Sequence, residues 1–564
     1  MKYVRNMAFI FIFSFFLFQI RGLAIELNVK DYITESDQDA SIGINKALDA
    51  ANEGDTILIP EGEYVISSRI VIRKSNLTIT GEDKSKTIIK CNDGTNNNWG
   101  VFLIQTSSTV TNNLKNITIE NLTIDGNRLN RNTPDLGQNQ LETHYGSGTG
   151  ISILRSNENY EVGNILISNV KIENAPGPAI QINGKRITHD VQVGDYDDVD
   201  RRSTDERYHV DGVTVTDCEL SNSKIGISQN TTKNDKILNN KIENSLHENI
   251  TIDLSDDCIC EGNNLGVFNG GCGSIGIDNS FNSIIRGNKI NNTGSNAGEL
   301  FNSGITVNSK AGISKNLIIE DNFIENANYG IFLKDHRGYV REEFKLSDRV
   351  EEYDYGSRPG EDFYILNNTI KNSVIYGIRV DELTGMAYII NNNIMSEQTS
   401  YNDYKNIYVN EYNYKKRNNE TESINNVIIG MIKELKVNKL PDKLKYNQGE
   451  NLDLTNGVFD VILEDDDVIS FNMNERFVHV SGFDRNNIDE QIIKLTFANS
   501  HLSLKINESD KEVIDNSNES VDRKDEVEVP QTSKNKKFIV IIFGIVLIIA
   551  AVIILQKSNK RDNN

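Results

Sequence analysis

The chain has 564 residues, which is enough for a large hydrophobic core and for more than one domain. Its formal net charge of -22 argues against a nucleic-acid-binding protein and against one that holds anionic surfaces through a basic patch. The five cysteines are odd in number and too few for a disulfide scaffold.

Residues 1–24 have the pattern of a secretory signal peptide. Lys2 and Arg5 precede an apolar run over residues 7–20, and Gly22-Leu23-Ala24 places small residues where signal peptidase requires them. We therefore expect the mature chain to begin at Ile25 and to fold outside the cytoplasm.

The first part of the mature chain predicts a helix followed by a strand. Apolar residues recur at helical spacing within residues 36–52, Gly54-Asp55 ends the helix, and residues 56–64 (TILIPEGEY) are typical of a strand and a turn. An open end of parallel strands would recruit another chain, so a solenoid needs a cap. The segment resembles the N-terminal cap of phage-tailspike and pectate-lyase-superfamily proteins. The resemblance implies that the helix covers the first coil.

A short phrase then recurs: two or three apolar residues, a polar pair containing Asn, and a closing Ile or Leu. From Ile242 onward the closing residues are roughly 22 to 25 positions apart, except for two steps of about 34 and 46 that must contain insertions, and such a period marks a solenoid. The closing residues are Ile124, Ile172, Leu220, Ile242, Leu265, Ile290, Ile324, Ile370 and Ile394.

The residue types around each closing position indicate strands rather than helices. Positions five and seven before it are mostly apolar and share one face of a strand, and a second strand follows at residues 250–252, 275–277, 305–307, 331–333 and 378–380. Asn recurs two positions before it. Because Asn tolerates the left-handed conformation and hydrogen-bonds along a turn, we expect a ladder at this corner. The ladder residues are Asn240, Asn263, Asn288, Asn322, Asn368 and Asn392.

These features resemble a right-handed parallel β-helix of the pectate-lyase-like superfamily, over residues 25–435. Leucine-rich repeats would show regularly spaced Leu and a helical half, which are absent, and Gly and Asn are too frequent for helices. Insertions at residues 128–147, 185–209 and 336–361 project from the stack. Such insertions commonly build a binding surface, although solvated polar loops are the alternative.

The C-terminal third predicts a change of fold. Residues 426–435 are expected to form a short helix that closes the solenoid, and residues 436–506 alternate short apolar runs with turns, as a small antiparallel β-sandwich does. Phrases such as Leu440-Pro441 and Val480-Ser481-Gly482-Phe483-Asp484 resemble a bacterial Ig-like domain, which implies a stalk or a weakly adhesive module. Residues 507–537 are polar and charged, and predict a disordered tether.

The C-terminus predicts surface attachment. Residues 538–555 are apolar and long enough to span a bilayer, and the basic tail 556–564 stays in the cytoplasm. The preceding VPQTS (529–533) resembles the sorting signal of Gram-positive sortase substrates, which usually begins with Leu and ends with Gly. The resemblance implies cleavage after Thr532 and linkage to cell-wall peptidoglycan; a plain membrane anchor is the alternative. Both place the protein on the outer face of a Gram-positive-type cell.

One pair of residues indicates chemistry. Asp253 and Asp278 close equivalent strands in neighbouring coils, so their carboxylates should stack about 4.8 Å apart. Carboxylates this close either bind a cation such as Ca²⁺ or share a proton. His247 and Glu248 lie in the turn that enters the Asp253 strand, which gives a candidate acid/base set of four residues. Turn chemistry at a strand end is the alternative.

The column that contains this pair predicts an outward polar stripe. Its other expected members are Asn183, Ser228, Asn308, Lys334 and Asp381, and Arg379 lies further along the same face. Arg379, Lys334 and Asp381 are the candidate substrate-binding residues. Cys258 and Cys260 fall on inward positions and are interpreted as small core residues, with a metal site that includes Cys272 as the weaker alternative.

Two classes of function remain. The first is a carbohydrate-active enzyme, namely a lyase, hydrolase or epimerase of an extracellular polysaccharide, and the second is a non-catalytic glycan- or matrix-binding adhesin. The carboxylate pair favours the enzyme. The motifs of polygalacturonases, pectate lyases and alginate epimerases are absent, so the resemblance does not carry a reaction. The acidic body disfavours a polyuronate unless Ca²⁺ bridges the charges.

Overall fold

The computed structural model describes residues 24–34, 38–96, 98–131, 147–187, 206–270, 273–293, 302–308, 314–334, 360–381, 383, 385–395, 406–409 and 427–507. Several predicted segments lie outside these residues: the signal peptide up to residue 23, nearly all of the tether, the sorting-like motif and the membrane segment 538–555. Within the described ranges, no helix has both the length and the apolar character needed to cross a bilayer.

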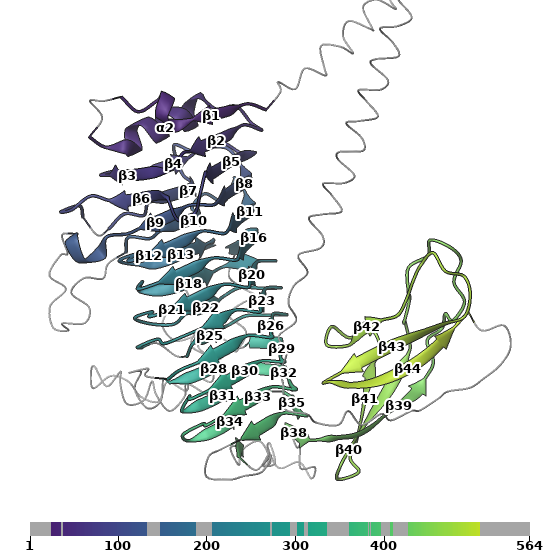
Figure 1. Cartoon of the computed structure of the whole chain (residues 1–564). Coiled ribbons are helices and arrows are strands. Elements are labelled where there is room, and N and C mark those ends of the chain that lie inside the picture. Colours follow the sequence, from purple (N-terminus) through teal and green to yellow (C-terminus); the bar gives the residue numbers. More distant parts are fainter. Residues whose placement is uncertain are drawn as a thin grey trace, which may run out of the picture. The chain divides into compact units, whose positions relative to one another are not determined.

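Three long parallel sheets make up most of the described chain, which confirms an all-β fold with a β-helix (Figure 1). Sheet A contains β1 (Glu26–Asn28), β2 (Thr56–Ile59), β5 (Leu77–Gly81), β8 (Leu114–Glu120), β11 (Val162–Ser168), β16 (Val210–Thr216), β20 (Lys236–Leu238), β23 (Ile259–Glu261), β26 (Ile284–Arg286), β29 (Ser314–Glu320), β32 (Gly360–Leu366), β35 (Ala387–Ile390) and β38 (Val427–Gly430), with β19 (Thr232–Lys233) beside β16. Sheet B contains β3 (Gly62–Ile66), β6 (Thr87–Cys91), β9 (Thr123–Asp125), β12 (Lys171–Glu173), β17 (Glu219–Ser221), β21 (Lys241–Glu243), β24 (Asn264–Leu265), β27 (Lys289–Asn291), β30 (Phe323–Glu325), β33 (Thr369–Lys371) and β36 (Asn393–Met395). Sheet C contains β4 (Ile70–Ile72), β7 (Phe102–Thr106), β10 (Ile151–Arg155), β13 (Pro178–Asn183), β18 (Ile225–Asn230), β22 (Ile250–Asp253), β25 (Ile275–Asp278), β28 (Ser303–Asn308), β31 (Tyr329–Leu333), β34 (Tyr376–Val380) and β37 (Ile407–Val409).

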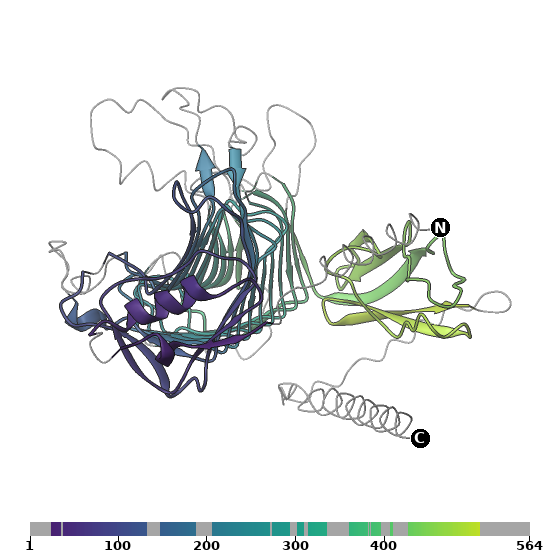
Figure 2. The ribbon, with the colours of Figure 1, turned by 90° about the horizontal axis from the view of Figure 1, so that it is seen from above.

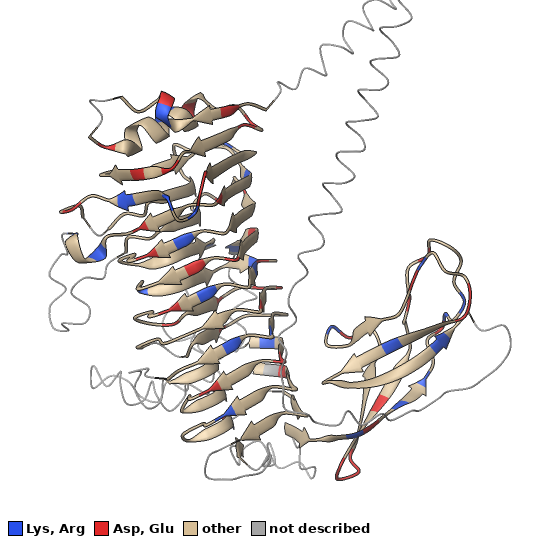
Figure 3. Cartoon of the chain, in the orientation of Figure 1, with Lys and Arg blue, Asp and Glu red and all other residues tan. Residues whose placement is uncertain are grey.

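Each coil contributes one strand to each sheet, where the sequence predicts two strands per coil. The additional strand is the closing aliphatic residue with its neighbours, as in Lys241–Glu243, whose central Ile242 is buried. A strand of three residues is too short to show an alternating pattern of apolar and polar residues, so the sequence does not reveal it. Apart from occasional polar residues, the inward side chains are aliphatic and form one core along the stack. Figure 3 shows that Lys, Arg, Asp and Glu positions are spread over the strands and the turns along the stack.

The corner between sheets A and B is held by the predicted asparagines. Five links join the six asparagines from Asn240 to Asn392. In each link, the Oδ1 of one asparagine accepts hydrogen bonds from the backbone N–H and the Nδ2 of the asparagine in the preceding coil, at 2.9–3.0 Å. At the start of the ladder, the backbone N–H of Cys218 donates to Asn240 Oδ1. The left-handed residue is the one before each ladder asparagine, for example Asn239 or Asp321. The expectation that the ladder residues themselves adopt that conformation is therefore wrong.

A second column explains how the coils close. In several sheet C strands, a glycine precedes the first buried isoleucine. An isoleucine of sheet B packs against this glycine and occupies the space that a Cβ atom would need. A Cβ atom at Gly304 would lie 2.5 Å from Ile324 Cγ2 and 2.6 Å from the carbonyl oxygen of Gly330.

Gly304→Ala is therefore expected to destabilise the fold by roughly 1–3 kcal/mol through overpacking. The denaturation midpoint measures this effect. Gly276→Ala is the matched control, since a Cβ there would meet no atom closer than 3.5 Å. Equal midpoints for the two variants would contradict the steric role of Gly304.

The N-terminal segment contains the helix α2 (Ala40–Ala50), and η1 (Val29–Asp31) precedes it. Asp39 begins α2, because its side chain accepts a hydrogen bond from the backbone N–H of Ser41 at 3.0 Å. Ile44, Ala47 and Leu48 are buried and belong to the core of the first coils. Seen along the stack in Figure 2, α2 lies across the end of the first coils.

The last described part contains two three-stranded antiparallel sheets, formed by β39 (Ile432–Lys439), β40 (Val458–Leu463) and β41 (Val468–Asn472), and by β42 (His479–Ser481), β43 (Gln491–Phe497) and β44 (Ser500–Ile506). We call residues 432–506 the C-terminal module. The helix expected over residues 426–435 is wrong, since residues 427–430 form β38 of sheet A and β39 begins at Ile432. The β-branched residues of Val427-Ile428-Ile429 favour this extended structure.

The core of the module continues onto the outside of sheet A. Ile318, Leu366 and Ile390 belong to the same buried cluster as the module's phenylalanines. Tyr364 contacts Phe477 with ring centroids 4.4 Å apart, and Asn391 Nδ2 donates to the carbonyl of Ala498 at 2.6 Å. Apolar packing therefore joins the module to the last coils.

Candidate functional site

The outer face of sheet C carries the predicted carboxylate pair. Asp253 lies opposite Asp278 in the parallel register of β22 and β25, and each is the last residue of its strand. Ile252 and Ile277, one position earlier, are buried in the core, so the two aspartates point outward. Neighbouring strands lie about 4.8 Å apart, which brings the two carboxylates within direct electrostatic reach.

The column differs from the prediction at one position. Asn230, and not Ser228, pairs with Asp253, and Ser228 instead pairs with Thr251. The reason is that β18 continues to Asn230 before the chain turns. On the other side, Asn308 pairs with Asp278. The carboxylate pair therefore lies between two asparagines.

Glu248 joins the pair, whereas His247 does not. A Cβ atom at Gly276 would lie 3.5 Å from Glu248 Cγ and 3.9 Å from its Oε1, so the absent side chain leaves room for this carboxylate on the face that carries Asp278. The His247 ring faces the loop of the following coil, where a Cβ at Gly270 would lie 3.3 Å from its Nδ1. The structure therefore brings three of the four predicted acid/base residues to one face.

The far end of the column is less exposed than predicted. Asn308, Lys334 and Asp381 lie on the outer face as expected, but they are only 3–7% exposed, so this end of the polar stripe is covered. Sequence alternation assigns a position to the outer face, but it does not show what covers that face.

Arg379 lies at this end among aromatic rings. Its guanidinium carbon is 4.6 Å from the ring centroid of Phe332, 5.5 Å from that of Tyr329 and 5.6 Å from that of Tyr408. Arg379 Nε contacts Asp381 Oδ1 at 2.9 Å. Tyr329 and Phe332 are buried and support the guanidinium, whereas Tyr408 is exposed. An exposed ring can stack on a sugar ring, and a fixed guanidinium can donate to sugar hydroxyls. We call Tyr329, Phe332, Tyr376, Arg379 and Tyr408 the aromatic–arginine patch.

A pocket of about 400 Å³ lies where the chain turns from sheet C into sheet A. It is bordered by β8, β10, β11, β16 and β19 and by the antiparallel hairpin of β14 (Lys185–Ile187) and β15 (Glu206–Tyr208), the base of the second predicted insertion. Sequence analysis marked the insertion but not the pocket. Its lining residues are Lys115, Arg155, Glu161, Val162, Gly163, Asn164, Arg207, His209, Asp211, Gly212 and Lys233.

The pocket has a local excess of basic side chains in an acidic protein. Arg155 is held by the carbonyl oxygens of His209 and Glu158, at 2.9 and 3.1 Å. Burial lowers the pKa of His209, although Asp256 Oδ2, 3.8 Å from its Nε2, opposes the shift. Asp256 lies three residues after Asp253, so the pocket adjoins the carboxylate column.

The cysteines have structural surroundings. Cys91, Cys218, Cys258 and Cys260 are buried and unbridged, and burial raises the pKa of Cys260 to about 12. A thiol that stays protonated is a poor metal ligand. Cys272, the third residue of the alternative metal site, lies outside the described residues.

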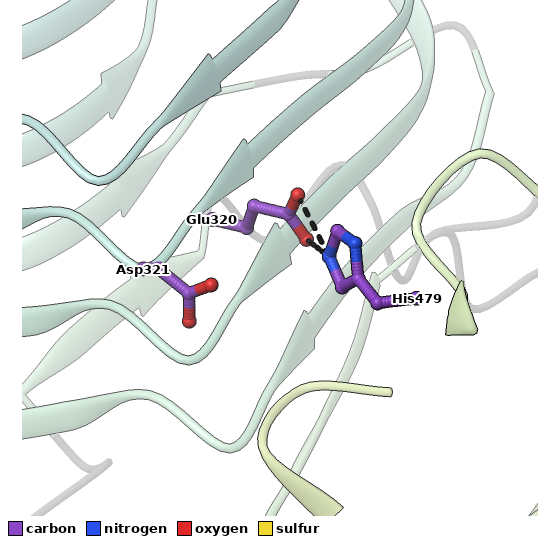
Figure 4. Close-up of side chains that lie close together, drawn as sticks. All are labelled: Glu320, Asp321 and His479. Carbon is purple, nitrogen blue, oxygen red and sulfur yellow. Dashed lines mark hydrogen bonds and ion pairs between the residues drawn. The ribbon is translucent and has the colours of Figure 1, made fainter. Parts of the chain in front are cut away.

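Sequence reasoning missed one cluster. Glu320 at the end of β29, Asp321 in the following corner and His479 of the C-terminal module place carboxylate oxygens and an imidazole nitrogen within 4.8 Å of one another (Figure 4). Glu320 and His479 are 159 residues apart, and no local pattern links them.

Comparisons with known proteins agree with this fold. Residues 27–147 match the family model described as rhamnogalacturonase A/epimerase, pectate lyase-like, which confirms the predicted likeness for the first coils. No curated protein matches the chain.

Similar solved structures include two enzymes and one adhesin. DFA-IIIase from Arthrobacter chlorophenolicus A6 is 12% identical with a TM-score of 0.44, covering 72% of this chain and 93% of that one. An exopolygalacturonase from Thermotoga maritima is 15% identical, with a TM-score of 0.43 and coverage of 67% and 86%. The surface protein and adhesin PfbA of Streptococcus pneumoniae is 16% identical, with a TM-score of 0.41 and coverage of 66% and 97%. These similarities are too distant to indicate an activity.

Proposed function

We propose that this protein is a surface-anchored carbohydrate-active enzyme, a polysaccharide lyase, glycoside hydrolase or epimerase, that acts on an extracellular polysaccharide along the outer face of sheet C. The observation that carries the proposal is the register of Asp253 with Asp278, with Glu248 over Gly276 on the same face. Most glycoside hydrolases use a pair of carboxyl groups for their acid/base chemistry.

The chemistry follows from the charge of the pair. In a carboxyl pair that shares one proton, the protonated group can give that proton to a glycosidic oxygen while its neighbour remains an anion. That anion can remove a proton from water or from a sugar carbon, or hold a cation such as Ca²⁺ against the polymer. The basic pocket beside the column offers Arg155 and Lys233 to an acidic sugar, which offsets the acidity of the whole chain.

The second candidate is a non-catalytic glycan- or matrix-binding adhesin. The aromatic–arginine patch favours it, because such a surface binds sugar rings without a reaction. The same patch serves an enzyme as a substrate-binding region, with Arg379 as its polar contact.

The proposal includes the anchoring and modular organisation expected from the sequence. The signal peptide directs secretion, and α2 caps the first coils. Residues 436–506 form an Ig-like spacer. Attachment through the segment 538–555, or by sortase at Thr532, then keeps the solenoid on the outside of the cell.

Asp253→Asn and Asp278→Asn are each expected to lower the reaction rate at least 100-fold while the fold is retained, because each removes a charge from an outward position. The purified protein is incubated with neutral and uronic-acid polysaccharides, with Ca²⁺ or with chelator. Reducing ends, unsaturated products and NMR of the recovered polymer report hydrolysis, elimination and epimerisation, respectively.

Glu243→Gln is the matched control, since Glu243 is an outward acid of sheet B in the coil of Asp253 and should leave the rate unchanged. Glycan retention without any product, unaffected by the aspartate variants and weakened by Arg379→Ala, would establish the adhesin instead.

A further inference from the structure

The group at Glu320, Asp321 and His479 joins two parts of the fold that the sequence keeps far apart (Figure 4). Glu320 ends β29 of sheet A, Asp321 occupies the left-handed corner position with φ 54°, and His479 begins β42 of the C-terminal module. The shared apolar core of sheet A and the module fixes this approach independently of the polar group.

Glu320 has an unusual environment for a carboxylate. It is 2% exposed, and its buried Oε1 accepts no hydrogen bond. His479 Nε2 lies 3.2 Å from Oε1 and 3.3 Å from Oε2, so one imidazole nitrogen faces both oxygens. A single N–H cannot satisfy two acceptors fully, and a buried acceptor without a donor costs roughly 1–3 kcal/mol.

The charges around the group sum to an excess of two negative charges. Arg286 contacts Glu261 at 2.7 Å and Glu320 Oε1 at 3.5 Å, and it acts on Asp321 through its charge alone, so one guanidinium serves three carboxylates. If the imidazole is neutral, the three carboxylates and the one guanidinium have a net charge of -2. One divalent cation neutralises this charge.

The donor set and its spacing select the kind of cation. Zn²⁺ takes imidazole and carboxylate donors at about 2.0–2.2 Å in a tetrahedron, which corresponds to donor separations of about 3.3 Å. The His479 and Glu320 atoms already have this separation, and the Asp321 oxygen lies within 4.8 Å of them. Ca²⁺ prefers six to eight oxygens and does not match a set that contains a nitrogen.

Outer contacts hold two of the three ligands in place, as they do at structural metal sites. Arg286 lies beside Glu320, and Asn367 Nδ2 donates to Asp321 Oδ1 at 2.6 Å. The His479 side chain is 40% exposed, which provides a route for the ion and room for water as a fourth ligand.

We propose that Glu320, Asp321 and His479 bind one Zn²⁺ ion, or a similar divalent transition metal, and that the ion fastens the C-terminal module to the last coils of the solenoid. The bound ion bridges two carboxylates of the solenoid and one imidazole of the module. It therefore stabilises the folded, docked state by mass action. The inference is independent of the proposed function.

The test uses the full-length chain, purified in mild detergent and dialysed against chelator, then titrated with ZnCl₂ by calorimetry. Asp321→Asn and His479→Gln are each expected to weaken Zn²⁺ binding at this site at least tenfold. Asparagine suits the left-handed position and can still accept from Asn367, so the first variant removes only the charge.

The matched controls are Asp217→Asn, at the equivalent left-handed corner of another coil with φ 55°, and His501→Gln on β44 of the module. Both should bind Zn²⁺ as the unaltered chain does. Co²⁺ serves as a spectroscopic probe, and its visible absorption should be lost in His479→Gln alone among the histidine variants. Zn²⁺ affinity that is unchanged in both site variants, or no binding to the unaltered chain, would overturn the proposal and leave an ion-paired contact only.

Discussion

Asn288→Ala is expected to lower the free energy of unfolding by about 4 kcal/mol, because the variant removes the buried side-chain hydrogen bonds of Asn288 and leaves the buried backbone N–H of Asn263 without its acceptor. Asn288 is 1% exposed. Its Oδ1 accepts from the N–H and Nδ2 of Asn263, at 3.0 and 2.9 Å. Its Nδ2 donates to the carbonyl of Cys260 at 2.9 Å and to Asn322 Oδ1 at 3.0 Å.

Urea denaturation followed by circular dichroism measures the loss. Asn92→Ala is the control, since Asn92 is an exposed turn residue whose side chain makes one long hydrogen bond, 3.3 Å to Ser67. The control should change the midpoint little. A midpoint for Asn288→Ala within error of the control would show that the ladder is not a major source of stability.

Asp235→Asn is expected to stabilise the protein above pH 7 by up to about 4 kcal/mol. Asp235 is 1% exposed, and burial raises its pKa from 3.8 to about 7. Each unit of pKa shift corresponds to about 1.4 kcal/mol. The folded state therefore binds more protons than the unfolded state between pH 3.8 and about 7, so stability falls as the pH rises through this window.

An asparagine at position 235 keeps the main hydrogen bonds without the buried charge. Its Oδ1 can still accept from the backbone N–H of Val213, which lies 2.8 Å from Asp235 Oδ1. Its Nδ2 takes the place of the Oδ2 that accepts from Gln229 Nε2 at 2.8 Å, so the Gln229 amide turns over in the variant and presents Oε1, which accepts no hydrogen bond in the wild type. Melting temperatures from pH 4 to pH 9 test this. The variant should gain on the wild type as the pH rises; a constant difference across the range would contradict the assigned titration.

Much of the fold follows from short patterns. The period of the closing residues, the alternating aliphatic strands and the repeated asparagines all reflect interactions between one coil and the next, which the sequence repeats. The strand of sheet B in each coil could not be predicted, because a segment of only three residues, such as the one around Ile242, is too short to show an alternating pattern. The left-handed position was misplaced by one residue, because Asn occurs at both corner positions and only geometry distinguishes them.

The candidate site was predictable only where it depends on register. Asp253 and Asp278 share a column because their coils are of similar length and lack an insertion between the two strands. Ser228 was misassigned because β18, with six residues, is longer than β22, with four. The pocket and the Glu320–His479 contact arise from turns and from docking between distant segments. Tertiary packing, and not local pattern, determines them.

The stacking direction has a mechanical consequence. Because strands of successive coils pair in parallel, their hydrogen bonds and those of the asparagine ladder point along the stack. A force along that direction acts on the hydrogen bonds of one coil at a time. It does not load many bonds in parallel, as a shearing force would. Each released coil of roughly 22 to 25 residues adds roughly 80 Å of extended chain. If the chain is anchored and bound to a polymer as proposed, it would lengthen in steps under tension. Each step would dissipate work before the contact with the polymer breaks.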